Sequence, residues 1–197
     1  LEAKFNRRIN IIESRSHVGR GYDYKREGRY EEALKEFNAV LDKYKDKPLS
    51  CAIAQRAIGD IYFEQSKYEE ALKAYTIVLE KYEGQSRIIS ALAQACIGKI
   101  YILMGKYEDA LKAHNTVLNK YKDQREACVI AQHEIGYIYL RMGKYEEAKG
   151  AWNKVVNEYN GHPYAKITKY ILENIPLESV QNLIDEDKNI FSRANFK

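Results

Sequence analysis

Four histidines are the residues of this sequence best suited to bind a metal or to move a proton. The closest approach to a metal motif begins at His133 and Glu134, which match the first half of the zinc pattern H-E-x-x-H. That pattern needs a second histidine four residues further on, so that both imidazoles lie on one helix face. Tyr137 occupies the position, so the motif is incomplete and we expect no metal site.

The three cysteines, Cys51, Cys96 and Cys128, are odd in number and lie far apart in the sequence. They form neither a disulfide framework nor a zinc-ligand spacing. Each sits among small and apolar residues of a predicted helix, which is typical of buried, unreactive thiols. Three unpaired thiols favour a reducing compartment such as the cytoplasm, while a periplasmic location stays open.

Carboxylates are numerous, but they lie in the first turns of predicted helices, as Glu69 and Glu70 do, where they complement the helix dipole. The glycines lie inside predicted helices or at their ends, and they form no phosphate-binding loop. We therefore predict that the chain is not an enzyme and that it uses no cofactor.

Charge and composition exclude two classes of partner. The net charge of +4 is small, and acidic and basic residues alternate along the predicted helices, whereas a nucleic-acid binder gathers basic residues on one face. Most of the 17 tyrosines recur at fixed positions of a repeat, which leaves too few for stacking on bases. No apolar run approaches the length of a membrane helix. We expect neither a nucleic-acid partner nor a membrane span.

One phrase of the sequence is written four times, at intervals of 38 or 39 residues. Its first tyrosine is Tyr30, Tyr68, Tyr107 or Tyr145. A glycine lies nine residues before each, at Gly21, Gly59, Gly98 and Gly136. A ring lies seven residues after each, at Phe37, Tyr75, His114 and Trp152. A fixed period of this length is the signature of stacked repeats, and it predicts that His114 is a packed core residue.

Each repeat is predicted to contain two helices. From Tyr68 to Tyr82 the apolar residues recur every three or four positions, which predicts a second helix with one buried stripe. The first helix precedes it at about residues 49–65, and so short a joint makes the two antiparallel. Left-handed glycines are expected to end first helices at Gly28, Gly105 and Gly143. Helix starts are expected at Pro48, at Ser86 and at the Asp123–Glu126 capping pair.

The glycine inside each first helix needs a reason, because it costs about 1 kcal/mol relative to alanine. We expect the missing side chain to let the two helices of a pair approach closely, with the alanine of the second helix opposite. Large aromatic residues would fill the space on either side. One pair cannot bury its apolar stripes alone, whereas stacked pairs bury them continuously.

The segment from Gly59 to Tyr75 resembles the tetratricopeptide repeat (TPR) family, in the spacing of Gly59, Tyr62, Ala71 and Tyr75. The resemblance covers about residues 18–160. The period of 38 or 39 exceeds the family's usual 34 or so and is similar to that of bacterial envelope-assembly TPR proteins. Where the family has a large aromatic residue four positions before the glycine, this chain has His17, Gln55, Gln94 and Gln132.

The resemblance implies an all-α fold, a right-handed α-solenoid of stacked antiparallel helix pairs that form a TPR-like superhelix. We expect one domain over residues 1–197, with about four repeats at 10–45, 48–83, 86–122 and 124–160. A helical extension at 1–9 would precede them. A helical cap at 163–190 would follow, interrupted by Pro176 and continued by an amphipathic segment with Leu177, Val180, Leu183 and Ile184 inward.

In the family, one side of the first helices lines a concave groove that binds partners. Carried over position by position, the resemblance implies a partner-binding groove formed by Arg15, Tyr22, Lys25, Arg26, Arg56, Phe63, Leu92, Lys99, Ile102, Leu103, His133, Tyr137, Leu140 and Arg141. This groove would be basic at its first repeat and apolar in the middle. Exposed apolar patches mark binding sites, but the longer helices could instead twist differently and place these residues in the core.

The most consistent function is that of a non-catalytic scaffold or adaptor for protein binding. A peptide or helical segment of a partner would insert apolar side chains into the middle of the groove, and an acidic flank would meet Arg15, Lys25 and Arg26. The alternative is a self-assembling, homo-oligomeric subunit of a larger complex, such as one in the bacterial cell envelope.

Overall fold

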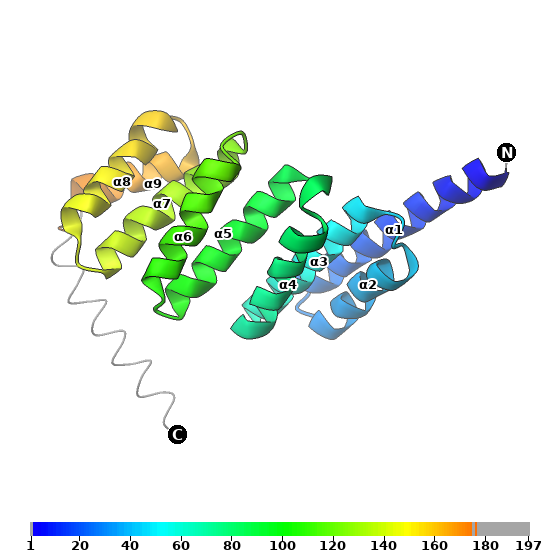
Figure 1. The fold of residues 1–197 in the computed structure, drawn as a ribbon. Coiled ribbons are helices and arrows are strands. Elements are labelled where there is room, and N and C mark those ends of the chain that lie inside the picture. Colours follow the sequence, from blue (N-terminus) through cyan, green and yellow to red (C-terminus); the bar gives the residue numbers. More distant parts are fainter. Residues whose placement is uncertain (1, 175, 177–197) are drawn as a thin grey trace, which may run out of the picture. The chain divides into compact units, whose positions relative to one another are not determined.

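The computed structural model describes residues 2–174 and residue 176, and every regular element in this part of the chain is helical (Figure 1). The first helices of the pairs are α1 (Glu2–Arg26), α3 (Pro48–Glu64), α5 (Arg87–Leu103) and α7 (Arg125–Arg141). The second helices are α2 (Tyr30–Lys43), α4 (Tyr68–Lys81), α6 (Tyr107–Lys120) and α8 (Tyr145–Glu158). A short 3₁₀ helix, η1 (Glu83–Gln85), precedes α5, and α9 (Pro163–Asn174) follows α8. The predicted all-α, helix-repeat class is confirmed.

The chain divides into two compact units, Leu1–Ile100 and Tyr101–Lys197, where the sequence predicts a single domain. In the first unit α1 packs with α2 and α3 packs with α4, while α3 also contacts α1 and α2. In the second unit α7 packs with α8 and contacts α6, and α9 packs on α8 and α7. Within each unit, therefore, each helix pair is stacked on the next element along the chain.

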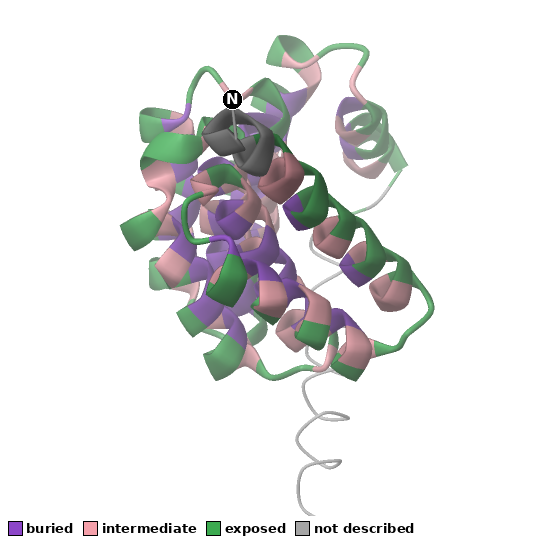
Figure 2. Ribbon diagram, turned by 90° about the vertical axis from the view of Figure 1, so that its right-hand side faces the viewer, coloured by how far each residue is buried: buried purple, intermediate pink, exposed green. Residues whose placement is uncertain are grey.

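The repeated columns of the sequence supply the core of these stacks. In α2 the residues Ala33, Phe37 and Val40 are fully buried. They belong to one core cluster with residues of α3, among them Ala54, Ala57 and Ile61. Figure 2 shows the same segregation on α1, the helix that starts at the label N, where buried and exposed residues occupy different sides. The apolar stripe of each helix is thus what holds each unit together.

In three of the first helices, α1, α3 and α7, the internal glycine makes room for an aromatic ring. A Cβ added to Gly21, Gly59 or Gly136 would lie 2.7, 2.6 or 2.3 Å from a ring atom of Phe37, Tyr75 or Trp152. These distances are shorter than any ordinary carbon contact, so no other residue fits without movement of the ring. The expected close approach is correct, but the residue opposite the glycine is the ring and not the alanine.

The helix ends agree with most of the sequence signals. Gly28, Gly105 and Gly143 have φ of +74°, +71° and +73°, which confirms the three left-handed caps. Pro48 occupies the first turn of α3, and the amide of Ile89 meets Ser86 Oγ at 3.5 Å. The predicted capping box at Asp123 is wrong, because α7 begins one residue later and its N-cap is Gln124, whose side chain makes no capping hydrogen bond.

The predicted C-terminal cap is described only in part. Its first portion is α9, which ends at Asn174, and the segment 177–190 lies outside the described residues. In the described part of the chain, no helix combines the length and apolar character that crossing a bilayer requires.

Candidate functional site

Seven side chains from three first helices meet on one side of the first unit. We call this set the first-helix face, and it consists of Tyr22, Lys25, Arg56, Asp60, Phe63, Glu64 and Lys99. The face links α1 to α3 and α3 to α5 through contacts between side chains 34 to 39 residues apart in sequence. Five of the seven belong to the predicted groove, and Asp60 and Glu64 add its acidic members.

A polar network holds the centre of the first-helix face. Arg56 forms an ion pair with Asp60 at 2.8 Å, and it donates a hydrogen bond to the hydroxyl of Tyr22 at 3.2 Å. The hydroxyl of Tyr75, on α4, donates to the other oxygen of Asp60 at 2.7 Å. Tyr75 is buried and the other three side chains are mostly buried. Each polar group therefore relies on its hydrogen-bond or ion-pair partner to offset the free energy of lost hydration.

Burial sets the protonation states around this network. It raises the pKa of the Cys96 thiol to about 11, with Asp60 adding to the shift. Burial opposes the charge on Arg56, but Asp60 and the nearby tyrosines more than offset this and keep the Arg56 pKa above its ordinary value. The thiol therefore stays protonated and the guanidinium stays charged at neutral pH, which leaves Cys96 without the thiolate that reactivity requires.

Phe63 supplies an apolar ring to the first-helix face. Its ring is partly exposed and lies 6.1 Å from the ring of Tyr68. The ammonium group of Lys99, an exposed residue of α5, lies 5.6 Å from the Phe63 ring centroid. This is within the range of a cation–π contact, so the surface offers an aromatic ring and a positive charge side by side.

The basic flank predicted for the first repeat is largely neutralised. Lys25 pairs with Glu64 at 2.5 Å across the two helices, and Arg26 pairs with Asp23 of its own helix. Arg15 is exposed on α1. Two of the three charges assigned to an acidic segment of a partner are therefore already matched within the unit.

In the second unit one predicted groove residue of α7, His133, contacts α9. The imidazole of His133 lies 2.8 Å from the hydroxyl of Thr168, and its ring lies edge-on to Tyr164 at 5.1 Å. Arg141 donates to the hydroxyl of Tyr137 at 3.0 Å. His133 is thus part of the packing between α7 and α9, and burial lowers its pKa to about 4.

Two predicted groove residues are core residues, which corrects the prediction. Ile102 is 5% exposed and packs with Ala110 and Ile138, and Leu140 is 4% exposed and packs with Ala148 and Trp152. Both lie in the last turn of a first helix, where the start of the second helix covers them. Of their neighbours in the prediction, Leu103 is 52% exposed and Leu92 is half-buried.

His114, Cys51 and Cys128 take the packed positions predicted for them. His114 is fully buried, and burial lowers its pKa to about 4. Cys51 and Cys128 are buried as well, and each thiol lies 3.3 Å from a backbone oxygen of Tyr44 or Tyr121. Among the residues that the structure describes, no group of three or more His, Cys, Asp and Glu side chains could hold a metal.

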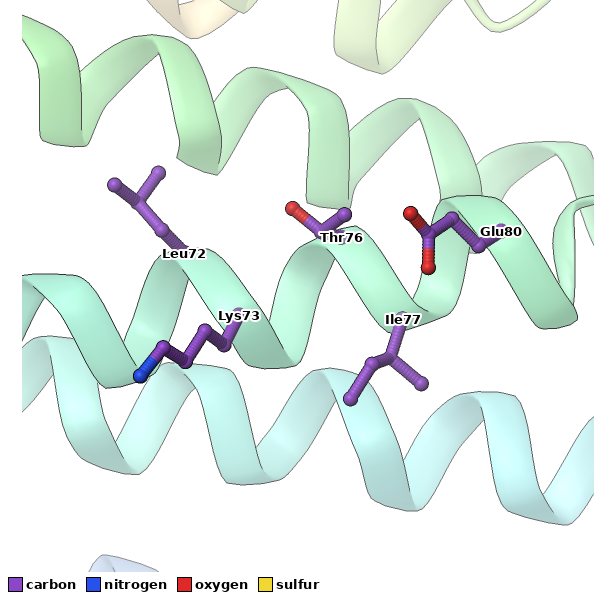
Figure 3. A pocket seen from close by; sticks show the side chains of 5 residues that line it. All are labelled: Leu72, Lys73, Thr76, Ile77 and Glu80. Atoms are coloured by element: carbon purple, nitrogen blue, oxygen red, sulfur yellow. The ribbon is translucent and has the colours of Figure 1, made fainter.

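An open hollow lies along α4, away from the predicted residues. Its described wall comes from α4 alone and consists of Leu72, Lys73, Thr76, Ile77 and Glu80 (Figure 3). A wall of one helix brings no polar groups together from several directions, as specific ligand sites do. The hollow is therefore a suitable control surface for substitutions that test binding elsewhere.

Comparison with known proteins agrees with the geometry. Two family models, each for the tetratricopeptide repeat, match residues 18–86 and 131–160. No curated protein matches the chain. Among solved structures, a tetratricopeptide repeat protein from Parabacteroides merdae ATCC 43184 is similar, with a TM-score of 0.63 and 23% identity. The match covers 92% of this chain and 65% of that one, so the chain spans less than two thirds of that relative.

Two further structures contain nearly identical TPR-like repeats of a Podosopora anserina protein named for kinesin light chains. Their TM-scores are 0.62 and 0.61, each at 18% identity, and the matches cover 93% of this chain and 96% and 97% of those chains. At such identities the likeness concerns the fold. With the two family matches and the glycine–ring pairs, it shows that this chain belongs to the tetratricopeptide repeat family.

Proposed function

We propose that the protein is a non-catalytic scaffold that binds a segment of another protein on the first-helix face. Repeats of this family generally mediate protein–protein interaction, and their scaffolds are generally not catalytic. The observation that carries the proposal is the partly exposed ring of Phe63 beside the ammonium group of Lys99. Aromatic side chains, phenylalanine included, are enriched in protein interfaces, and a cation over a ring face adds a favourable electrostatic contact.

The separation of packing residues from variable residues supports the first-helix face as the binding surface. The columns repeated in all four copies are used in packing, since Ala33, Ala71, Ala110 and Ala148 are each fully buried. Many residues that differ between copies lie on the first helices, where Arg56 and His133 hold equivalent positions and Lys99 holds the position of Asp60. A surface that varies on a constant frame can recognise one partner without changing the fold.

The first-helix face is ordered before any partner arrives. Arg56 is fixed by Asp60 and Tyr22, and Lys25 is fixed by Glu64. Side chains already held in place lose less conformational entropy on binding. We expect the partner's segment to place an apolar side chain against Phe63 and a carboxylate near Lys99. We do not expect it to place an acidic run along α1, because Lys25 and Arg26 are already paired.

The test is affinity capture from an extract of the cell that makes the protein, with three baits. The first is the wild-type chain, and the second carries Phe63→Ser with Lys99→Ser. The third, a matched control, carries Lys73→Ser with Ile77→Ser and so loses one lysine and one apolar residue from the α4 hollow. Circular dichroism establishes that all three are folded.

The proposal predicts a protein that the wild-type and control baits retain and the Phe63/Lys99 bait loses. If the folded Phe63/Lys99 bait retains every captured protein, the first-helix face is not the binding surface.

A further inference from the structure

Helix α9 occupies the place of a first helix that lacks its second helix. It packs on α8 and α7 just as α3 packs on α2 and α1. It also begins with a proline, Pro163, as α3 begins with Pro48. Aligned on these prolines, Ile167 corresponds to Ala52 and Tyr170 corresponds to Gln55.

Those two positions face the second helix in the complete pairs. Ala52 of α3 and its counterpart Val129 of α7 are both fully buried. Gln55 donates to the backbone oxygen of Ala74 on α4 at 3.3 Å. The counterpart of Gln55 in α7, Gln132, donates in the same way to Ala151 on α8 at 3.2 Å.

On α9 the same two positions are open. Ile167 is 54% exposed and Tyr170 is 63% exposed. The other side of α9 is packed, since Ala165 and Thr168 are buried. An apolar pair left uncovered at the two positions that are closed in α3 and α7 indicates a face made to receive a helix.

We propose that residues 177–190 form the second helix that covers this face and so complete a fifth pair. The segment has the same length as the second helices, each of which has 14 residues. Its apolar residues Leu177, Val180 and Ile184 have the spacing of Tyr68, Ala71 and Tyr75 in α4. Pro176 separates it from α9, since helices usually end before a proline.

Charge complementarity supports the same occupant. Lys166 and Lys169, both exposed, lie next to Ile167 and Tyr170 on α9, and Lys169 also lies 3.7 Å from the carboxylate of Glu173. The segment carries an acidic residue near its start and three in a row near its end, which are Glu178, Asp185, Glu186 and Asp187. An acidic amphipathic helix therefore matches an apolar face bordered by lysines. This inference is independent of the function proposed for the first-helix face.

Hydrogen exchange of the full chain, read by mass spectrometry, tests the proposal. We expect the amides of 177–190 to exchange at least about tenfold more slowly than those of an unstructured peptide. Ile184→Asp should abolish that protection and accelerate exchange in α9. Asn182→Asp, which adds the same charge on the opposite side of the predicted helix, should leave both segments unchanged. Emission from Trp152, the sole tryptophan, reports in each variant that the second unit is folded.

Three results would overturn the proposal. One is exchange of 177–190 at the rate of an unstructured peptide in the wild-type chain. Another is equal protection in the wild type and the Ile184→Asp variant. The third is protection that appears only as concentration rises, together with a dimer in light scattering that Tyr170→Asp disperses, because the occupant would then be a second copy.

Discussion

At the scale of single residues, the glycine–ring pairs are the most constrained contacts in the molecule. In the second unit, Trp152 is held from two sides, because its indole nitrogen also donates to the backbone oxygen of His133 at 3.0 Å. The ring therefore cannot move away from Gly136 without losing a hydrogen bond. This constraint makes the cost of a single methyl group measurable.

We predict that Gly136→Ala lowers the free energy of unfolding by about 1–2 kcal/mol. Overpacking costs about 1–3 kcal/mol, and the better helix propensity of alanine returns up to about 1 kcal/mol. The control is Gly150→Ala in α8, where an added Cβ meets nothing within 4 Å, and it should stabilise by about 0.5–1 kcal/mol. Urea denaturation measures both, and a stabilising Gly136→Ala would show that the ring has room.

The buried histidine His114 predicts a dependence of stability on pH. Burial lowers its pKa in the folded state to about 4 from an ordinary 6.5. Below pH 6.5 the unfolded chain takes up a proton that the folded chain refuses, so stability is complete above that pH and falls as the pH drops towards 4. At about 1.4 kcal/mol per pKa unit the full loss is about 3 kcal/mol. His133 acts in the same direction.

Replacing His114 with phenylalanine should remove its share of this loss, since Phe37 fills the equivalent position in the first repeat. We expect the stability difference between about pH 7 and about pH 5 to be smaller in His114→Phe than in the wild type. Urea denaturation at both pH values measures it. An equal loss in both proteins would mean that His114 is not the group that titrates.

At the scale of elements, the joints between first and second helices differ in one residue. Gly28, Gly105 and Gly143 adopt positive φ, and Ser66 adopts φ of 58° at the equivalent joint of the second repeat. A side chain in the left-handed region costs about 1–2 kcal/mol, which glycine avoids.

Ser66→Gly should therefore stabilise the first unit by about 1 kcal/mol, after allowance for the greater freedom of glycine in the unfolded chain. Gly105→Ala is the reciprocal control and should destabilise by a similar amount. Thermal denaturation of the two variants and the wild type measures whether the positive φ of Ser66 lowers the melting midpoint. A lower midpoint for Ser66→Gly would contradict the strain at this joint.

Helix ends were predictable where a residue type dictates a backbone conformation. Glycine caps and the first-turn proline are local signals, so Gly28 and Pro48 were placed correctly. Asp123 was misplaced because a side chain that caps a helix and one that does not look alike in sequence, and α7 begins one residue later than predicted. The left-handed Ser66 gave no signal, because serine rarely adopts that conformation and only the neighbouring repeats show the need for it.

At the scale of the whole molecule, buried columns that repeat in every copy support first-helix residues that differ between copies. The repeat period and the buried columns were predictable because four copies in phase reinforce one another. The site was predictable only in part, since Ile102 and Leu140 are covered by the helices that follow them. The Lys25–Glu64 pair joins residues of different helices, and it depends on a register between those helices that sequence does not specify.

We propose that a partner binds the first-helix face, and oxidative footprinting of the protein with its captured partner provides the test. The partner should slow the oxidation of Tyr22 and Phe63 in the complex. The oxidation of Leu72 and Ile77, in the α4 hollow, should stay at the rate of the free protein. Protection of Leu72 and Ile77 with unchanged oxidation of Tyr22 and Phe63 would place the partner on the second helices and contradict the claim.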